Sequence, residues 1–313
     1  MFQNLLVPLD GSVLAECVLP HAVAMAKAFD AQITLLNVIE QPTEAFGRPK
    51  SDPLDWYLKK TEATTYLEGI KTRLEKSGLA VKTLLLEGRA IEQIIENAHA
   101  NNVDLLILSS CGSRDVNGWS VSGIVQRTRT STLIIRAHHA NTPQDGNLRY
   151  RHLLVPLDGS RRAASALPFA TALVQAHQAE LTLVHVVNKP EMARYMPLTQ
   201  EDAELMSHVV ERNRAEGTRY LEEMLVHLPP NVQTRLLISE NVATTLQSFS
   251  EQEQIDLLIL SAHGYSGEAK WPYGSVTNRF ITDSRVPLLI IQDLPQQSAE
   301  TTREDVAVRQ MGR

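Results

Sequence analysis

The octapeptide LLVPLDGS occupies Leu5–Ser12 and recurs letter for letter at Leu153–Ser160, 148 positions further along the chain. The same offset also matches many of the residues that follow each copy. Another shared stretch, DLLILS, begins at Asp104 and again at Asp256. This pattern indicates a duplicated domain, because solenoid repeats have much shorter periods of roughly 20–50 residues.

Composition limits what this chain of 313 residues does. Its length favours two domains of roughly 100–200 residues, and its 43% apolar residues are ordinary for a globular protein. A net charge of −6 without a Lys/Arg block argues against nucleic-acid binding, which depends on neutralising phosphates. We expect neither a signal peptide nor a membrane span, which needs roughly 18 apolar residues. The isolated Cys17 and Cys111 fit a reducing compartment, so we expect a cytoplasmic protein without a membrane partner.

Strand and helix patterns alternate within each copy. Leu5–Leu9 is a short continuous apolar run, which is typical of a strand buried on both faces, and apolar residues at helical spacing follow it. In the first copy we expect strands at 5–9, 33–39, 81–86, 104–108 and 132–135, with helices at 15–29, 53–77, 90–100 and before the last strand. In the second copy we expect strands at 153–157, 181–187, 232–238, 256–260 and 287–291, with helices at 163–177, 200–226, 242–253 and 275–283. This alternation predicts an α/β fold of two tandem Rossmann-like, doubly wound domains, each with a five-stranded parallel sheet in the order 3-2-1-4-5.

Two segments without periodicity set the predicted domain boundaries. Residues 140–151 are polar and rich in turn residues, which is typical of a linker, and residues 295–313 have the composition of a flexible tail. The predicted organisation is therefore domain 1 at 1–139 and domain 2 at 152–294. Pro20 and Pro168 lie inside the first helix pattern of each domain, where we expect a kink or a late helix start.

The Asp-Gly-Ser triplet follows the first strand of each copy. In an open parallel sheet, ligands bind beyond the carboxyl ends of the strands where the strand order reverses, here between the first and fourth strands. Asp158 should therefore face the turn Ser261-Ala-His-Gly264, and nine residues later Gly274-Ser275-Val276 opens a helix. A carboxylate can accept hydrogen bonds from ribose, and the amides of a helix N-terminus bind anions. Each feature alone also fits an ordinary cap or turn, but their joint placement indicates a nucleotide.

These motifs resemble the tandem universal stress proteins over nearly all of residues 1–293. The nucleotide-binding pattern of that family is Gly-x2-Gly-x9-Gly-Ser/Thr with an aspartate after the first strand, and domain 2 departs from it at Ser261, in place of the first glycine. The resemblance implies an adenine nucleotide, first of all ATP, with Mg²⁺ accompanying its phosphates. The residues that it assigns to the ligand are Pro156, Leu157 and Asp158 at adenine and ribose, Val186 at adenine, and Gly264, Gly274, Ser275 and Val276 at the phosphates. Ser261 is a further candidate at the phosphate end, where its side chain stands in the place that backbone takes in the family pattern. His263 either contacts phosphate or a divalent ion or packs within its loop.

Domain 1 departs further from the family pattern. Asp10 and Gly112 correspond to Asp158 and Gly264, but nine residues after Gly112 the small pair is reversed to Ser122-Gly123. We therefore expect a degenerate site in domain 1, empty or altered in its ligand, in which Asp10 and Gly112 are the remaining candidates.

Two functional hypotheses stand. The chain has no P-loop, dinucleotide-binding, metalloprotease or serine-hydrolase motif, so we expect no catalytic residue and no protein-held metal, with slow ATP hydrolysis the one activity left open. The first hypothesis is a stress-response regulator that binds the nucleotide in domain 2 and changes its contacts with an unidentified protein through the loop 271–273. The second is an interaction scaffold with both pockets empty. The resemblance also implies that the last strands, 132–136 and 287–291, pair as an intrachain pseudo-dimer, while a homodimer of whole chains is left open.

Overall fold

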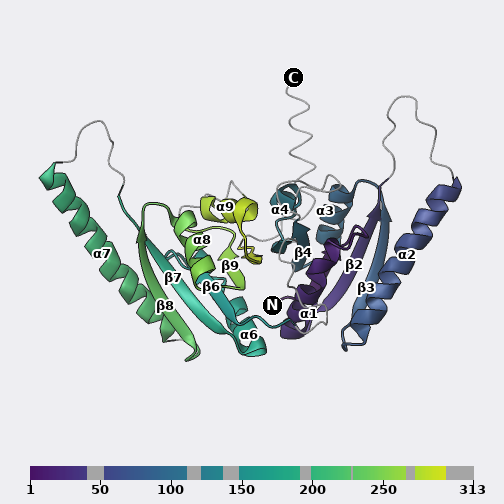
Figure 1. Ribbon diagram of the computed structural model, residues 1–313, viewed down its shortest axis with the longest axis horizontal. Helices are drawn as coiled ribbons and strands as arrows, with labels where there is room; N and C mark the ends of the chain where they lie inside the picture. Colours follow the sequence, from purple (N-terminus) through teal and green to yellow (C-terminus); the bar gives the residue numbers. More distant parts are fainter. Residues whose placement is uncertain are drawn as a thin grey trace, which may run out of the picture. The chain divides into compact units, whose positions relative to one another are not determined.

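The structure, a computed structural model, describes residues 1–40, 53–110, 121–136, 148–190, 199–226, 228–265 and 272–293. Strands and helices alternate along both halves (Figure 1), which confirms the predicted α/β fold. The first half contains β1 (Asn4–Pro8), η1 (Ala15–Val18), α1 (Leu19–Phe29), β2 (Gln32–Ile39), α2 (Pro53–Glu75), β3 (Val81–Glu87), α3 (Ala90–Ala100), β4 (Leu105–Ser110), α4 (Val121–Thr128) and β5 (Ser131–Arg136). The second half contains β6 (His152–Pro156), α5 (Arg161–Ala164), α6 (Leu167–His177), β7 (Glu180–Asn188), α7 (Gln200–Leu225), β8 (Val232–Ser239), α8 (Val242–Gln252), β9 (Leu257–Ser261), α9 (Ser275–Asp283) and β10 (Leu288–Ile291).

The strand order of each half agrees with the prediction. It is β3-β2-β1-β4-β5 in the first half and β8-β7-β6-β9-β10 in the second. Leu153 of β6 is the parallel register partner of both Leu181 in β7 and Leu257 in β9. The first strand of each half therefore lies beside both the second and the fourth, and the crevice where the order reverses opens at their carboxyl ends.

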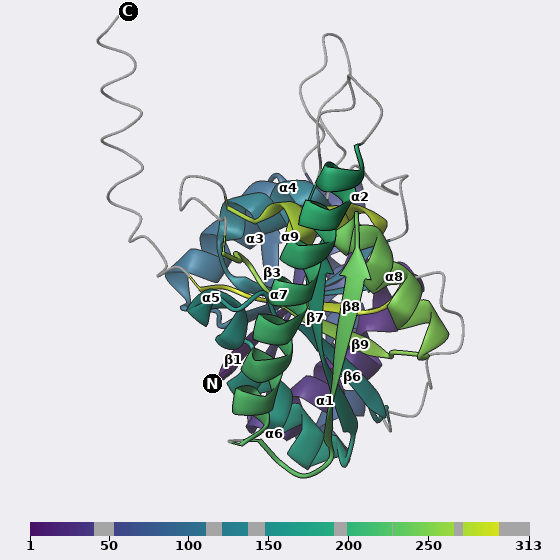
Figure 2. The ribbon, with the colours of Figure 1, turned by 90° about the vertical axis from the view of Figure 1, so that its left-hand side faces the viewer.

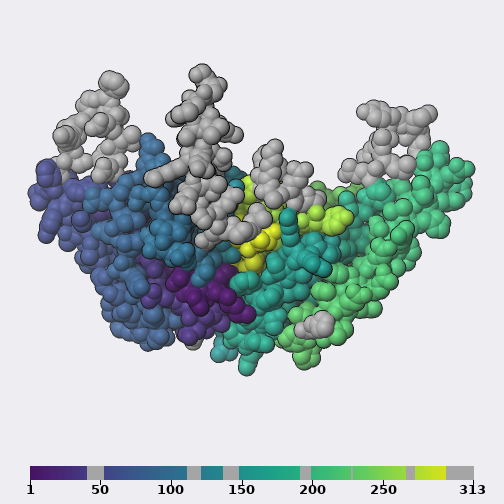
Figure 3. Space-filling view, turned by 180° about the vertical axis from the view of Figure 1, so that it is seen from behind, coloured from purple at the N-terminus to yellow at the C-terminus, as the bar shows by residue number. Residues whose placement is uncertain are grey.

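Helices cover both faces of each sheet, which explains why the strands are apolar without alternation. Leu153, Leu154 and Val155 of β6 are all fully buried. Figures 1 and 2 show α7 along β7 and β8 on one face of the second sheet and α8 on the other. In the space-filling view of Figure 3, the green surface of α7 and β8 forms one long edge of this half.

The prolines of the first helix pattern determine where the helices start. The helices α1 and α6 begin at Leu19 and Leu167, so Pro20 and Pro168 lie in their first turns. A proline in the first turn removes no intrahelical hydrogen bond, because the amides there have no partner within the helix. The expected late helix start is confirmed, and the short segments η1 and α5 take up the residues before it.

The repeated aspartate before the fourth strand has a structural role in both copies. The Asp104 carboxylate accepts hydrogen bonds from the backbone amides of Gln3 and Asn4 at 2.8 and 2.9 Å. Asp256 accepts from the backbone amide of Arg151 at 2.6 Å in the same way. These carboxylates tie the start of the first strand to the start of the fourth, which aligns the two strands that flank the crevice.

The compact units of the fold do not coincide with the boundary between the repeats. The second unit contains Leu148–Asp293 together with Leu133–Arg136 from β5. Within this unit, the Arg136 Nη2 donates a hydrogen bond to the carbonyl oxygen of Ile281 at 2.6 Å, in the last turn of α9. A guanidinium is favourable there, because the C-terminus of a helix carries partial negative charge. Among the described residues, no helix combines the length and apolar composition needed to cross a bilayer.

Candidate functional site

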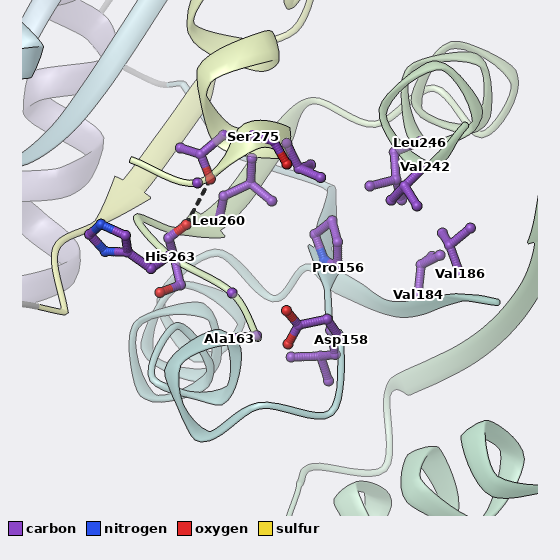
Figure 4. A pocket seen from close by; sticks show the side chains of 16 residues that line it. Pro156, Asp158, Ala163, Val184, Val186, Val242, Leu246, Leu260, His263 and Ser275 are labelled. Carbon is purple, nitrogen blue, oxygen red and sulfur yellow. Dashed lines mark hydrogen bonds between the residues drawn. The ribbon is translucent and has the colours of Figure 1, made fainter. Parts of the chain in front are cut away.

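One cavity of about 180 Å³ lies at the carboxyl ends of β6, β7 and β9 (Figure 4). The sequence-based candidates of the second half come from separate stretches of the chain, and the parallel topology brings the ends of these stretches to the same edge of the sheet. All ten of these candidates line the cavity: Pro156, Leu157, Asp158, Val186, Ser261, His263, Gly264, Gly274, Ser275 and Val276.

The cavity has an apolar end that sequence reasoning largely missed. Figure 4 shows Val184, Val186, Val242 and Leu246 grouped on one side of the cavity, away from His263 and Ser275. Their spacing in the sequence could have revealed them. Val184 is two residues from Val186 and shares its strand face, while Val242 and Leu246 are four residues apart and share a face of α8. The remaining lining residues that were missed are Ala163, Leu260 and Thr277.

Asp158 bridges the two sides of the crevice. Its Oδ1 accepts a hydrogen bond from the backbone amide of Ser160 at 3.0 Å, and its Oδ2 accepts one from the amide of Tyr265 at 2.6 Å. A Cβ atom at Gly264 would overlap Oδ2, so the glycine is required for the carboxylate to approach this turn. Burial, with a contribution from the Asp158 charge, raises the pKa of Tyr220 on α7, so its phenol is neutral at physiological pH.

The N-terminus of α9 forms the opposite end of the cavity. Gly274 is its N-cap residue, and its amide donates to the carbonyl oxygen of Ala262 at 2.8 Å. Gly274 has no side chain with which to cap the helix, while Ser275 and Val276 of its first turn line the cavity. Amides at a helix start carry partial positive charge and need acceptors, so this end suits an anion.

His263 lies in the turn between β9 and α9, but its imidazole is engaged away from the cavity. The Nδ1–H donates to Oδ1 of Asp293 at 2.6 Å, and both side chains are buried. The other carboxylate oxygen of Asp293 lies 3.5 Å from Nε of Arg162. In Figure 4 the His263 ring points away from Asp158. The ring thus anchors the glycine turn to the residues just after β10, and no pattern in the sequence indicated Asp293 as its partner.

A side chain of the second strand fixes the backbone just before the repeated aspartate. The His185 Nδ1–H donates to the carbonyl oxygen of Leu157 at 2.8 Å, and Asn37 Nδ2 donates to the equivalent oxygen of Leu9 at 2.7 Å. The imidazole of His185, which is larger than the Asn37 amide, fits because Gly217 of α7 has no side chain. A Cβ at Gly217 would lie only 2.7 Å from His185 Cδ2. The two halves therefore hold the same leucine carbonyl with different side chains, Asn37 in the first and His185 in the second.

The first half differs at the equivalent positions. Asp10 accepts a hydrogen bond from the amide of Ser12 at 2.8 Å and lines a separate cavity of about 570 Å³ between the end of β2 and the charged side chains of α2. Ser122 and Gly123 lie inside α4, whereas Gly274 is an N-cap. Gly112, the predicted partner of Asp10, lies outside the described residues.

Duplication, strand order and the cavity at the strand ends define a tandem Rossmann-like α/β protein. The universal stress protein family matches residues 1–136 and 149–292. The chain belongs to this family and contains two copies of its domain.

Individual relatives agree with this assignment. Universal stress protein Rv2005c of Mycobacterium tuberculosis is 23% identical over 304 residues, covering 92% of this chain and 96% of the relative. Universal stress protein MJ0531 of Methanocaldococcus jannaschii is 26% identical over 128 residues, which cover 41% of this chain and 75% of that protein. The crystal structure of a universal stress protein from Archaeoglobus fulgidus shares the fold, with a TM-score of 0.62 and 20% identity over 92% of this chain and 98% of that one.

Proposed function

We propose that the second domain binds an adenine nucleotide, with ATP first among the candidates, and that binding changes what the protein contacts in a stress response. One observation carries the proposal: a single cavity is apolar at one end, has the Asp158 carboxylate beside it, and ends at the N-terminus of α9, whose N-cap Gly274 offers no capping side chain. Base, ribose and phosphates present matching chemistry in the same order.

Each part of the nucleotide has a group to meet. The valine and leucine side chains of β7 and α8 suit the flat faces of adenine. Each Asp158 oxygen accepts one backbone N–H and keeps a further lone pair for a ribose hydroxyl. The amides of Ser275 and Val276 suit phosphate oxygens. Mg²⁺ would arrive on the phosphates, since no group of three or more His, Cys, Asp or Glu among the described residues could hold a metal ion.

In this proposal the protein is a regulator rather than an enzyme. It acts in the cytoplasm, and its two domains are those predicted from the sequence, 1–139 and 152–294. Grouping of Leu133–Arg136 with the second unit supports an intrachain pseudo-dimer built on the last strands. The nucleotide-dependent partner is an unidentified protein, and Trp271 of the loop assigned to it lies outside the described residues. In the same loop, Tyr273 is only 2% exposed, so the aromatic ring packs inside the domain.

A pure interaction scaffold is the second candidate. Two observations favour it: both oxygens of Asp158 already accept backbone amides, and the small pair of the first half lies inside α4. In this case the fold would serve only to pair the domains and present a surface.

Two measurements separate the candidates. Mass spectrometry of small molecules released from heat-denatured, freshly purified protein should detect an adenine nucleotide, and titration should show one ATP site per chain. Asp158→Ala should weaken ATP binding about tenfold or more, because it removes an ionised hydrogen-bond acceptor. Asp10→Ala is the matched control and should leave the affinity unchanged. No binding by the wild type would favour the scaffold, and equal affinity of Asp158→Ala would remove that residue from the site.

A further inference from the structure

A buried network of side chains lies behind the turn that follows β9. The Nδ1–H of His263 donates to Oδ1 of Asp293 at 2.6 Å, and these side chains are 0% and 5% exposed. The other carboxylate oxygen of Asp293 lies 3.5 Å from Nε of Arg162, whose side chain is 38% exposed. A buried carboxylate is unfavourable unless hydrogen bonds and an opposite charge compensate it, so the imidazole and the guanidinium together make this position of Asp293 possible.

The network joins three segments that are far apart in the sequence. Arg162 belongs to α5, His263 to the turn after β9, and Asp293 follows β10. The residue after Arg162 and the residue after His263 both line the cavity, while the His263 ring points away from Asp158 (Figure 4). The turn is therefore tied on its cavity side by Asp158 and on its other side by Asp293.

The first half of the chain replaces every member of this network. At the positions equivalent to Arg162, His263 and Asp293 it has Leu14, Cys111 and Ala137. None of these residues carries a guanidinium, an imidazole or a carboxylate, so the first half cannot build the same network. The small pair at the helix start is also displaced in that half, where it lies inside α4. The network is thus present in the half that retains the nucleotide motif and absent from the half in which the motif is degenerate.

We propose that Asp293 is a positioning residue for nucleotide binding. Through the His263 ring it holds the turn after β9 where the backbone of that turn meets the phosphates, and Arg162 compensates its buried charge. This inference rests on the proposed function and gives a role to two residues, Asp293 and Arg162, that do not line the cavity. A turn that is held in place before the ligand arrives loses less conformational entropy on binding, so Asp293 strengthens binding without touching the nucleotide.

Charge alone predicts the opposite effect of removing Asp293. ATP and AMP are anions, so the loss of a nearby carboxylate should strengthen their binding by weakening a repulsion. Direct binding of the phosphates by Arg162 makes the same prediction, because Asp293→Ala releases the guanidinium from its partner. A positioning role predicts weaker binding, so the sign of the change in affinity separates these roles.

The test is calorimetric titration of the full-length wild type and its variants with ATP, AMP and adenosine. Asp293→Ala should weaken the binding of ATP and AMP about fivefold or more. Asp293→Asn keeps an acceptor for the His263 N–H and should recover most of that loss. Adenosine, which has no phosphate, should bind both variants like the wild type. Glu216→Ala, which removes a carboxylate from an exposed ion pair on α7, is the matched control and should leave all three affinities unchanged.

Equal or tighter binding of ATP by Asp293→Ala would overturn the inference, as would a lack of recovery in Asp293→Asn. If Asp293→Ala does not fold, the double variant His263→Cys/Asp293→Ala takes its place. It introduces both residues of the first half and removes the buried donor together with its acceptor, which leaves neither unpaired. The double variant should also bind ATP and AMP more weakly and adenosine equally, and unchanged ATP affinity would contradict the role of the pair. If the wild type binds no adenine nucleotide, the proposed function fails as well, whereas wild-type binding with unaffected variants removes only the role of Asp293.

Discussion

Replacing Gly264 with alanine tests whether Asp158 holds the two sides of the cavity together. The new Cβ would overlap Asp158 Oδ2, which accepts the hydrogen bond from the Tyr265 amide at 2.6 Å. The Gly264 φ is not in the left-handed region, so alanine adds this collision without backbone strain. A hydrogen bond to a charged group contributes about 1.5–3 kcal/mol, and because Asp158 is exposed we expect a loss of about 1.5 kcal/mol in unfolding free energy.

A double-mutant cycle isolates this contact. In an Asp158→Ala background the collision is absent, so Gly264→Ala should cost less than about 0.5 kcal/mol there. Urea denaturation of the four proteins measures the coupling. Strictly additive losses would show that the carboxylate and the turn do not depend on each other, and the reasoning would be refuted.

Nucleotide titration of the same four proteins separates two roles of Gly264. If the glycine only admits Asp158, Gly264→Ala should lower affinity in the wild-type background and change little once Asp158 is alanine. If phosphate itself must approach the Gly264 backbone, affinity should fall in both backgrounds.

Two further predictions replace a residue of one half with the residue at the equivalent position of the other half. Burial lowers the pKa of His21 from its ordinary value near 6.5 to about 3, so its contribution to stability is complete above pH 6.5 and is lost as the pH falls towards 3. The wild type should lose about 2 kcal/mol of unfolding free energy between pH 7 and 5 through protonation of His21 on unfolding. His21→Phe, which introduces the residue found at the equivalent position 169, should abolish this loss when stability is measured by urea denaturation at both pH values. The same pH dependence of stability in both proteins would show that His21 is not its source. Gly217→Ala would place a Cβ 2.7 Å from His185 Cδ2 and should cost about 1–3 kcal/mol by overpacking. Adding His185→Asn, the residue of the first half, should restore most of the melting temperature, and a lack of rescue would exclude the ring as the obstacle.

The repeat and its periodicities were enough to predict the fold. Continuous apolar strands such as Leu153–Leu157 indicate burial on both faces, and their alternation with helices leads to parallel sheets. Parallel strands end at a common edge, so residues just after β6, β7 and β9 had to meet there. For this reason, all ten residues predicted from the sequence for the ligand site of the second half line the same cavity.

The long-range contacts made by those residues were decided by tertiary packing. Asp158 accepts from an amide 107 positions away, and His263 pairs with Asp293, 30 positions away. Whether a carboxylate turns towards the cavity or towards the protein depends on side-chain rotamers and on the space that distant residues leave. The same holds for the glycine at 217 that admits the His185 ring. Sequence periodicity carries the position of an element and its buried face, but pairwise fit between distant side chains exists only once the elements are packed.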